Sequence, residues 1–372
     1  MKRFFILLIF FPVLAFAESM YSPTWGFFLD LPEGYEYIGG DARDRFSFAG
    51  PGDAMFDIAV YNGRYNTVEE LVNDVSRRLS NKGEVDYFQY HGKQAAIFSL
   101  NFNELNGWAV SLALESLSNQ PLWLLALAYG PSANKELELF HMSALDSLCP
   151  TQAERRYPGP IMEYSFPRGE KKRVSLALKG VSGTIYENDA EAAQVLIERE
   201  FIILQHFANS PNWKEAWTRY YRAIFRDSYD RISDAASMIV RNWGGPPSGG
   251  EQEKRAFAQR ALDFVQEFNY ERDLTGSDFL NLVSAIADGR GDCDSRAMLW
   301  AIILDKSQIP ASMMISRQHS HAMGLADLPG SGARFESFGI QWLVAETTAK
   351  VGIGMIAQDF SDPSNWLGVI FE

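Results

Sequence analysis

Residues 297–304 are apolar without interruption, and they follow a short polar turn that contains one of the chain's two cysteines. The turn reads Gly291-Asp292-Cys293-Asp294, and the apolar residues read AMLWAIIL. A helix that is hydrophobic on every side has to be covered on every side by other elements. The sequence therefore predicts a domain built around this helix, with Cys293 in its first turn.

Cys293 has the position of a nucleophile. Unpaired amides and the positive end of the dipole at a helix N-terminus favour an anion. With a histidinium nearby, the pKa of such a thiol falls from about 8.5 to roughly 3.5–7.5. Two alternatives stay open, because an oxidising compartment would favour a disulfide to Cys149 and because the thiol could be buried and inert.

Two histidines and a glutamate downstream supply the groups that a thiol nucleophile needs. His319 and His321 are two residues apart, so on a strand their side chains point to the same face. Trp342, Val344 and Glu346 share one face of the next predicted strand. If the two strands pair as a hairpin, Glu346 reaches the imidazole of His321 and orients it for proton transfer. His319 is the rival base.

Residues 257–356 resemble the transglutaminase-like, papain-type cysteine superfamily. The matching features are a lead-in VQEFNYERDLTGSDFL, Gly291-Asp292-Cys293 before a buried helix, a strand starting near Pro310, His321-Ala322, and WLVAETT at 342–348. The resemblance implies a central cysteine helix packed on an antiparallel sheet, and a triad of Cys293, His321 and Glu346. The resemblance favours His321 over His319 as the base, because Ala322 follows His321. Much of the family has aspartate where this chain has Glu346, which accepts the same hydrogen bond.

Such a triad performs acyl transfer. The backbone amide of Cys293 is the expected oxyanion donor. Asp292 and Asp294 would raise the pKa of the thiol if they pointed at it, so we expect them to turn outward and to cap the helix. His319 and Trp342 are expected to support the site.

The mechanism requires no metal or organic cofactor. Cys293, His321 and Glu346 are also zinc ligand types, but they lack the closely spaced ligand pair that is typical of zinc sites.

The first part of the chain predicts a separate α+β domain over 18–149. Strands in which apolar and polar residues alternate are expected at 45–50, 55–61, 95–102 and 108–116, and a more continuously apolar strand is expected at 121–130. Thr67 and Glu70 form a capping-box pattern before a helix at 68–79, and a second helix fits 134–148. This order predicts an antiparallel sheet with helices on one face, and with the opening residues it weakly resembles the PsbP-like sandwich.

A proline-rich stretch, 150–172, is the expected linker to a second domain at 173–372. A strand pair is predicted at 173–186, turning at Gly180 or Gly183, followed by helices over 190–243, 251–268 and 277–289. The aromatic stripe of Trp213, Trp217 and Tyr221 predicts a packed helix face. The overall fold class is α+β.

Residues 1–17 have the charged start, apolar run and Ala15-Phe16-Ala17 end of a cleaved signal peptide. The sequence therefore predicts an exported protein, periplasmic or extracellular, with no membrane span in the mature chain. A formal charge of −13 argues against binding to nucleic acid.

These observations predict an exported, thiol-dependent acyl-transfer enzyme that acts on peptides or proteins by hydrolysis or by cross-linking. A cell-wall peptide is one such substrate. The alternative is a catalytically inactive module of the same fold that binds a partner in the cell envelope.

Overall fold

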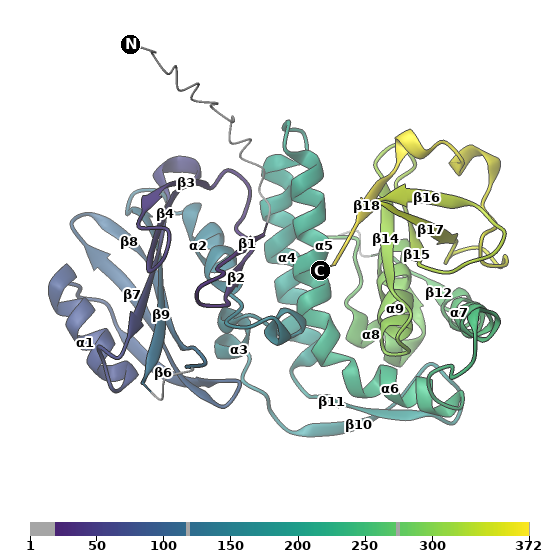
Figure 1. Cartoon of the computed structure of the whole chain (residues 1–372), viewed down its shortest axis with the longest axis horizontal. Coiled ribbons are helices and arrows are strands. Elements are labelled where there is room, and N and C mark those ends of the chain that lie inside the picture. Colours follow the sequence, from purple (N-terminus) through teal and green to yellow (C-terminus); the bar gives the residue numbers. More distant parts are fainter. Residues whose placement is uncertain (1–18, 117–119, 273–275, 372) are drawn as a thin grey trace, which may run out of the picture.

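The computed structural model describes residues 19–116, 120–272 and 276–371. The predicted signal peptide, 1–17, lies outside the described residues. The fold is α+β, with one antiparallel sheet near each end of the molecule and a layer of helices between them (Figure 1).

The first sheet has seven antiparallel strands in the order β3-β4-β5-β9-β8-β7-β6. Their bounds are Glu36–Gly40 (β3), Arg45–Ala49 (β4), Met55–Asn62 (β5), Val85–Tyr90 (β6), Lys93–Phe102 (β7), Leu105–Ala113 (β8) and Leu122–Pro131 (β9). The five predicted strands are confirmed, while β3 and β6 at the two edges were not expected. A two-stranded hairpin, Met20–Tyr21 (β1) with Phe28–Leu29 (β2), precedes the sheet.

Helices cover both faces of this sheet, so the prediction of helices on one face is wrong. Val68–Leu79 (α1) packs with Phe98 and Leu125, and Leu137–Asp146 (α2) packs with Ile97 and Val110 on the opposite face. Successive residues of a strand point to opposite faces of the sheet. In the central strands the residues on both faces are apolar, so each face can be covered by a helix.

The helix start predicted from Thr67 and Glu70 is confirmed, but Glu70 binds the amide of Asn66 and not that of the N-cap residue Thr67. The Thr67 hydroxyl accepts the Glu70 amide at 3.3 Å, and the Glu70 carboxylate accepts the Asn66 amide at 2.8 Å.

Residues 150–172, the expected linker, are packed in the structure. They include Ala153–Arg156 (η2) and Pro160–Ser165 (α3), and the Asp146 carboxylate accepts the amides of Ile161 and Met162 at 3.0 and 3.1 Å. A hairpin follows, with Lys171–Ser175 (β10) paired to Ser182–Tyr186 (β11). Gly180 lies in its turn with a φ of +80°, a conformation that glycine adopts without strain. The division of the chain into domains stays a prediction.

Five helices follow this hairpin in the chain, and α4 and α5 form the layer between the two sheets (Figure 1). Their bounds are Asp189–Phe207 (α4), Trp213–Arg231 (α5), Ser233–Asn242 (α6), Glu251–Gln266 (α7) and Leu282–Asp288 (α8). The predicted helical stretch over 190–243 is thus divided into three helices. The last of these five is shorter than predicted, because the Asn281 side chain caps it by accepting the Ser284 amide at 2.9 Å. Among the described residues, no helix has the length and apolar character needed to cross a membrane.

The cysteine helix, Cys293–Asp305 (α9), packs on a second antiparallel sheet with the strand order β16-β17-β15-β14-β18. The strand bounds are Ala311–Ser316 (β14), His321–Ala326 (β15), Arg334–Ser337 (β16), Ile340–Ala345 (β17) and Leu367–Val369 (β18). Two short strands, Asn269–Tyr270 (β12) and Arg290–Gly291 (β13), pair in parallel just before the helix.

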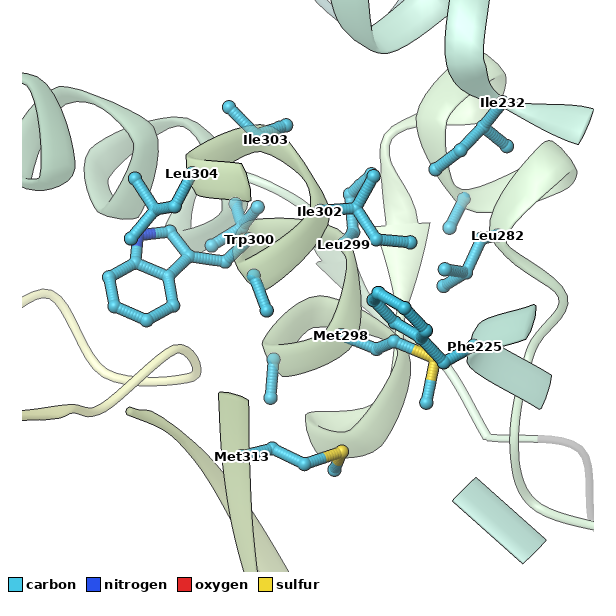
Figure 2. Close-up of a cluster of buried hydrophobic side chains, with 14 of the residues drawn as sticks. Phe225, Ile232, Leu282, Met298, Leu299, Trp300, Ile302, Ile303, Leu304 and Met313 are labelled. Carbon is cyan, nitrogen blue, oxygen red and sulfur yellow. The ribbon is translucent and has the colours of Figure 1, made fainter. Parts of the chain in front are cut away.

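Other elements cover the cysteine helix on every side, as its sequence predicts. Residues 297–304 are all at most 1% exposed. Figure 2 shows α9 side chains packed among Phe225 of α5, Leu282 of α8 and Met313 of β14. Trp300 also donates its indole N–H to the Ala258 carbonyl of α7 at 3.1 Å.

We expect Gly324→Ala to loosen the contact between α9 and β15. A Cβ atom at Gly324 would lie 2.5 Å from Cε3 of Trp300, and overpacking of this kind costs about 1–3 kcal/mol. Urea denaturation should show this loss in the free energy of unfolding. Gly39→Ala is the matched control, because nothing lies within 4 Å of its Cβ position. Equal stability of the two variants would contradict the prediction.

Candidate active site

Asp292 fixes the start of the cysteine helix. Its Oδ1 accepts the Ser295 amide at 2.6 Å, and its Oδ2 accepts the Leu280 amide at 3.2 Å. The side chain is completely buried, so Asp292 caps the helix as expected but does not turn outward. Arg296 adds hydrogen bonds to the carbonyls of Gly291 and Phe268, at 3.0 and 2.7 Å. Cys293 therefore has a fixed position in the first turn.

The Cys293 thiol lies directly beside the start of β15. It is 1% exposed, and the backbone amide of Ala322 lies near enough to lower its pKa. Because Ala322 follows His321, this contact brings the thiol next to the residue that carries the imidazole. Both cysteines are free, so Cys293 is not bonded to Cys149.

His321 and Glu346 form a direct side-chain pair. The distance from His321 Nε2 to Glu346 Oε2 is 2.8 Å. The second carboxylate oxygen accepts the amide and the hydroxyl of Thr348 at 2.7 and 2.6 Å. With Nε2 occupied by Glu346, Nδ1 is the nitrogen that remains for a proton from the thiol.

The environment keeps Glu346 ionised. Burial opposes its charge, but the hydrogen bonds from His321 and Thr348 outweigh burial and hold the pKa of Glu346 below its ordinary value. The same carboxylate can therefore stabilise an imidazolium at His321.

The expected lowering of the thiol pKa does not occur. Burial, followed by the charges of Asp294 and Asp292, raises the pKa of Cys293, while the Ala322 amide and Arg272 offset only part of the effect. A helix N-terminus contributes typically 0.3–1 kcal/mol, which is less than the cost of burying a charged sulfur. Cys293 thus rests as a neutral thiol.

Asp294 faces the neighbouring helix. Its Oδ1 accepts the hydroxyl of Tyr221 on α5 at 3.1 Å. Burial, together with Asp292 and Asp278, raises the pKa of Asp294 well above its ordinary value. Asp294 is half-buried and binds Tyr221 in place of the backbone amides at the helix start, so the expected cap is formed by Asp292 and not by Asp294.

His319 and Trp342 lie near the pair without joining it. The Nε2 of His319 is buried and has no hydrogen-bond partner among the described residues, whereas Glu346 binds His321. Trp342 packs with Met323 and Val344 on the sheet face opposite α9, and its indole N–H donates to the Ser337 carbonyl at 3.1 Å. Trp342 supports the sheet and has no contact with the thiol.

Two aromatic residues that the sequence analysis missed surround the imidazole. The ring of Phe360 is stacked on His321 with centroids 5.3 Å apart and an angle of 29°, and Trp366 lies 6.3 Å away. Both belong to the segment around Gln358–Phe360 (η3) and Pro363–Asn365 (η4). The only signal in the sequence is two aromatic residues in the otherwise polar stretch QDFSDPSNW.

A cavity of about 260 Å³ opens beside His321. It lies between α5 and the turn that joins β14 to β15, and Trp217, Tyr221, Asp294 and His321 are among the residues that line it. The cavity gives a substrate room next to the imidazole. Among the residues that the structure describes, no group of three or more His, Cys, Asp or Glu side chains is placed to hold a metal ion.

No family model matches the chain, and no curated protein sequence matches it. Several solved structures are distantly similar. LapG of Legionella pneumophila, EGTA-treated, is 15% identical with a TM-score of 0.23, over 46% of this chain and 78% of that one. A candidate cysteine protease of Cytophaga hutchinsonii is 10% identical with a TM-score of 0.24, over 87% and 70%. A candidate protease of Parabacteroides distasonis is 9% identical with a TM-score of 0.21, over 81% and 68%.

We expect the rate of Cys293 alkylation to depend on pH as it does for a thiol whose pKa is raised. The measurement is the rate of iodoacetamide labelling between pH 6 and 10 in Cys149→Ser, which leaves Cys293 as the sole thiol. The rate should rise about tenfold per pH unit and should still rise above pH 9, the ordinary pKa of the group. N-acetylcysteine is the control that levels off near that value. A rate that is constant between pH 6 and 8 would instead show a thiolate at rest.

Proposed function

We propose that this protein is a thiol-dependent acyl-transfer enzyme that acts on peptides or proteins, with Cys293 as nucleophile, His321 as base and Glu346 as orienting acid. The observation that carries the proposal is the hydrogen bond of 2.8 Å between His321 and Glu346. The Cys293 thiol lies near the backbone amide of Ala322, the residue that follows His321. These contacts support the order of nucleophile, base and orienting group that covalent catalysis requires.

The first half of the reaction forms an acyl-enzyme. Nδ1 of His321 takes the proton of the neutral thiol as the sulfur attacks the carbonyl carbon. Glu346 stabilises the imidazolium without taking its proton. The backbone amide of Cys293, at the start of α9, stabilises the developing oxyanion. When the tetrahedral intermediate collapses, the imidazolium gives its proton to the departing amine and a thioester remains.

The second half releases the acyl group. His321 takes a proton from water, or from a second amine, as that molecule attacks the thioester. The thiol recovers its proton from the imidazolium. Water gives hydrolysis, and an amine gives transfer or cross-linking. A cell-wall peptide is one substrate on which either outcome is useful.

We further propose that the protein is exported, to the periplasm or beyond the cell. The support for this is the sequence of residues 1–17, with its basic start, apolar run and small residues at the end.

One observation favours a second candidate, a module that binds peptides without processing them. Cys293 is 1% exposed, and burial raises its pKa. A thiol that stays covered when a peptide binds would be inert.

Substitutions at the three residues distinguish the two candidates. The substrate is a proteome-derived peptide mixture with blocked amines, and mass spectrometry reads the new N-termini. Cys293→Ala should abolish cleavage, and His321→Asn should reduce it by about 10²–10⁴-fold, which is the usual contribution of an acid–base residue. Glu346→Gln should reduce it by at least about tenfold, because it removes the charge that stabilises the imidazolium.

Two conservative variants serve as controls for this experiment. Glu346→Asp restores the charge and should recover part of the activity, and Cys149→Ser should cleave like the wild type. Cleavage that persists in Cys293→Ala would contradict the proposal. Absence of cleavage by the wild type, together with tight peptide binding, would identify the protein as the binding module.

A further inference from the structure

The cavity beside His321 has an aromatic wall. Trp217 and Tyr221 are one turn apart on α5, and their rings are stacked with centroids 5.8 Å apart at an angle of 25°. Ile315 of β14 also lines the cavity. The prediction that these residues form a packed helix face is confirmed, since Tyr221 is 2% exposed and Trp217 packs against the same core. Both side chains also line one side of the cavity. An apolar part of a peptide fits against such a wall.

Arg317 lies at the edge of the same cavity and is held in a defined place. Its guanidinium lies 5.0 Å from the centroid of the Trp213 ring, and Nη2 donates to Asn209 Oδ1 at 3.0 Å. Trp213 starts α5, and Asn209 lies in the connection from α4. These contacts orient the arginine from two sides, although the side chain is exposed to solvent.

Among the described residues, no carboxylate lies within ion-pairing distance of Arg317. The other arginine at the cavity, Arg272, is paired with Asp278 at 2.7 Å. Asp294 is engaged by the hydroxyl of Tyr221. Arg317 is therefore the charged group at this cavity that is both oriented and uncompensated.

We propose that Arg317 is a specificity-determining residue that binds a substrate carboxylate close to the bond under attack. This inference rests on the proposed function for the identity of the ligand as a peptide. The planar guanidinium makes paired hydrogen bonds to a carboxylate, and His321 in the same cavity places that carboxylate within a few residues of the reacting carbonyl. The preferred substrate is a peptide with an apolar residue against Trp217 and an acidic group at Arg317.

A single negative charge suits this site better than a phosphate. The chain has a formal charge of −13, so a dianion is repelled more strongly than a monoanion. The carboxylate can come from an Asp or Glu side chain or from the free C-terminus of the peptide, and the experiment separates these sources.

The test measures binding to full-length Cys293→Ala, so that bound peptides are not consumed. An array presents peptides in matched pairs, with Glu against Gln at each position and a free C-terminal acid against the amide. A charge-assisted hydrogen bond at a partly exposed site predicts a preference of about 3- to 10-fold for the acidic member. The position in the peptide at which the preference appears identifies the source of the carboxylate.

A second substitution, added to the Cys293→Ala protein, tests whether Arg317 causes the preference for acidic peptides. Arg317→Gln should abolish it, Arg317→Lys should retain part of it, and Arg317→Glu should reverse it toward peptides with lysine. Arg241→Gln is the matched control, because Arg241 is exposed on α6 and does not line the cavity. Equal binding of the paired peptides, a preference that survives Arg317→Gln, or no binding by any peptide would overturn the inference.

Cleavage of the peptide mixture separates failure of this inference from failure of the proposed function. Cleavage that depends on Cys293 but shows no enrichment of acidic groups near the cut overturns the role of Arg317 and leaves the enzyme intact. An acidic preference in binding without any cleavage that depends on Cys293 supports the role of Arg317 and overturns the enzyme.

Discussion

The packing of α9 on the second sheet is the constraint on which the site depends. Residues 297–304 of this helix are at most 1% exposed, and Trp300 lies against Gly324, where a Cβ atom would come within 2.5 Å of its ring. This close approach sets the distance between the helix and β15. The helix supplies Cys293 and the strand supplies His321, so the separation of the thiol and the imidazole follows from the apolar core and not from the polar residues themselves.

The helix α5 connects this core to the first sheet. One of its faces carries Arg219, which bonds Glu33 at 3.1 Å and Glu200 at 2.5 Å, and all three side chains are buried. Another face carries Trp217 and Tyr221 at the cavity. Removing one partner of a buried ion pair costs about 3–5 kcal/mol. Arg219 therefore ties the helix that forms a wall of the candidate site to α4 and to the segment between β2 and β3.

Much of this arrangement could be predicted from local sequence. Thr67 and Glu70 mark a helix start through contacts within one turn, and the apolar run after Cys293 requires a buried helix. The surroundings of the charged side chains at the site could not be predicted from the sequence. Asp292 turns inward because the Leu280 and Ser295 amides need an acceptor, and Phe360 reaches His321 from a segment with no regular pattern. The Phe360 contact joins residues that are distant in sequence, and Asp292 is held inward by the Leu280 amide from outside its own helix. The burial that raises the pKa of Cys293 also depends on residues from several elements.

The central claim is that the Cys293 sulfur and the His321 imidazole adjoin each other in the folded protein. 1,3-Dibromoacetone tests this directly, because it alkylates a thiol and then a second nucleophile within its own short span, with loss of two bromide ions. Mass spectrometry of the digested protein should show Cys293 bridged to His321. Cys293 alkylated without a bridge, or bridged to His319, would contradict the account.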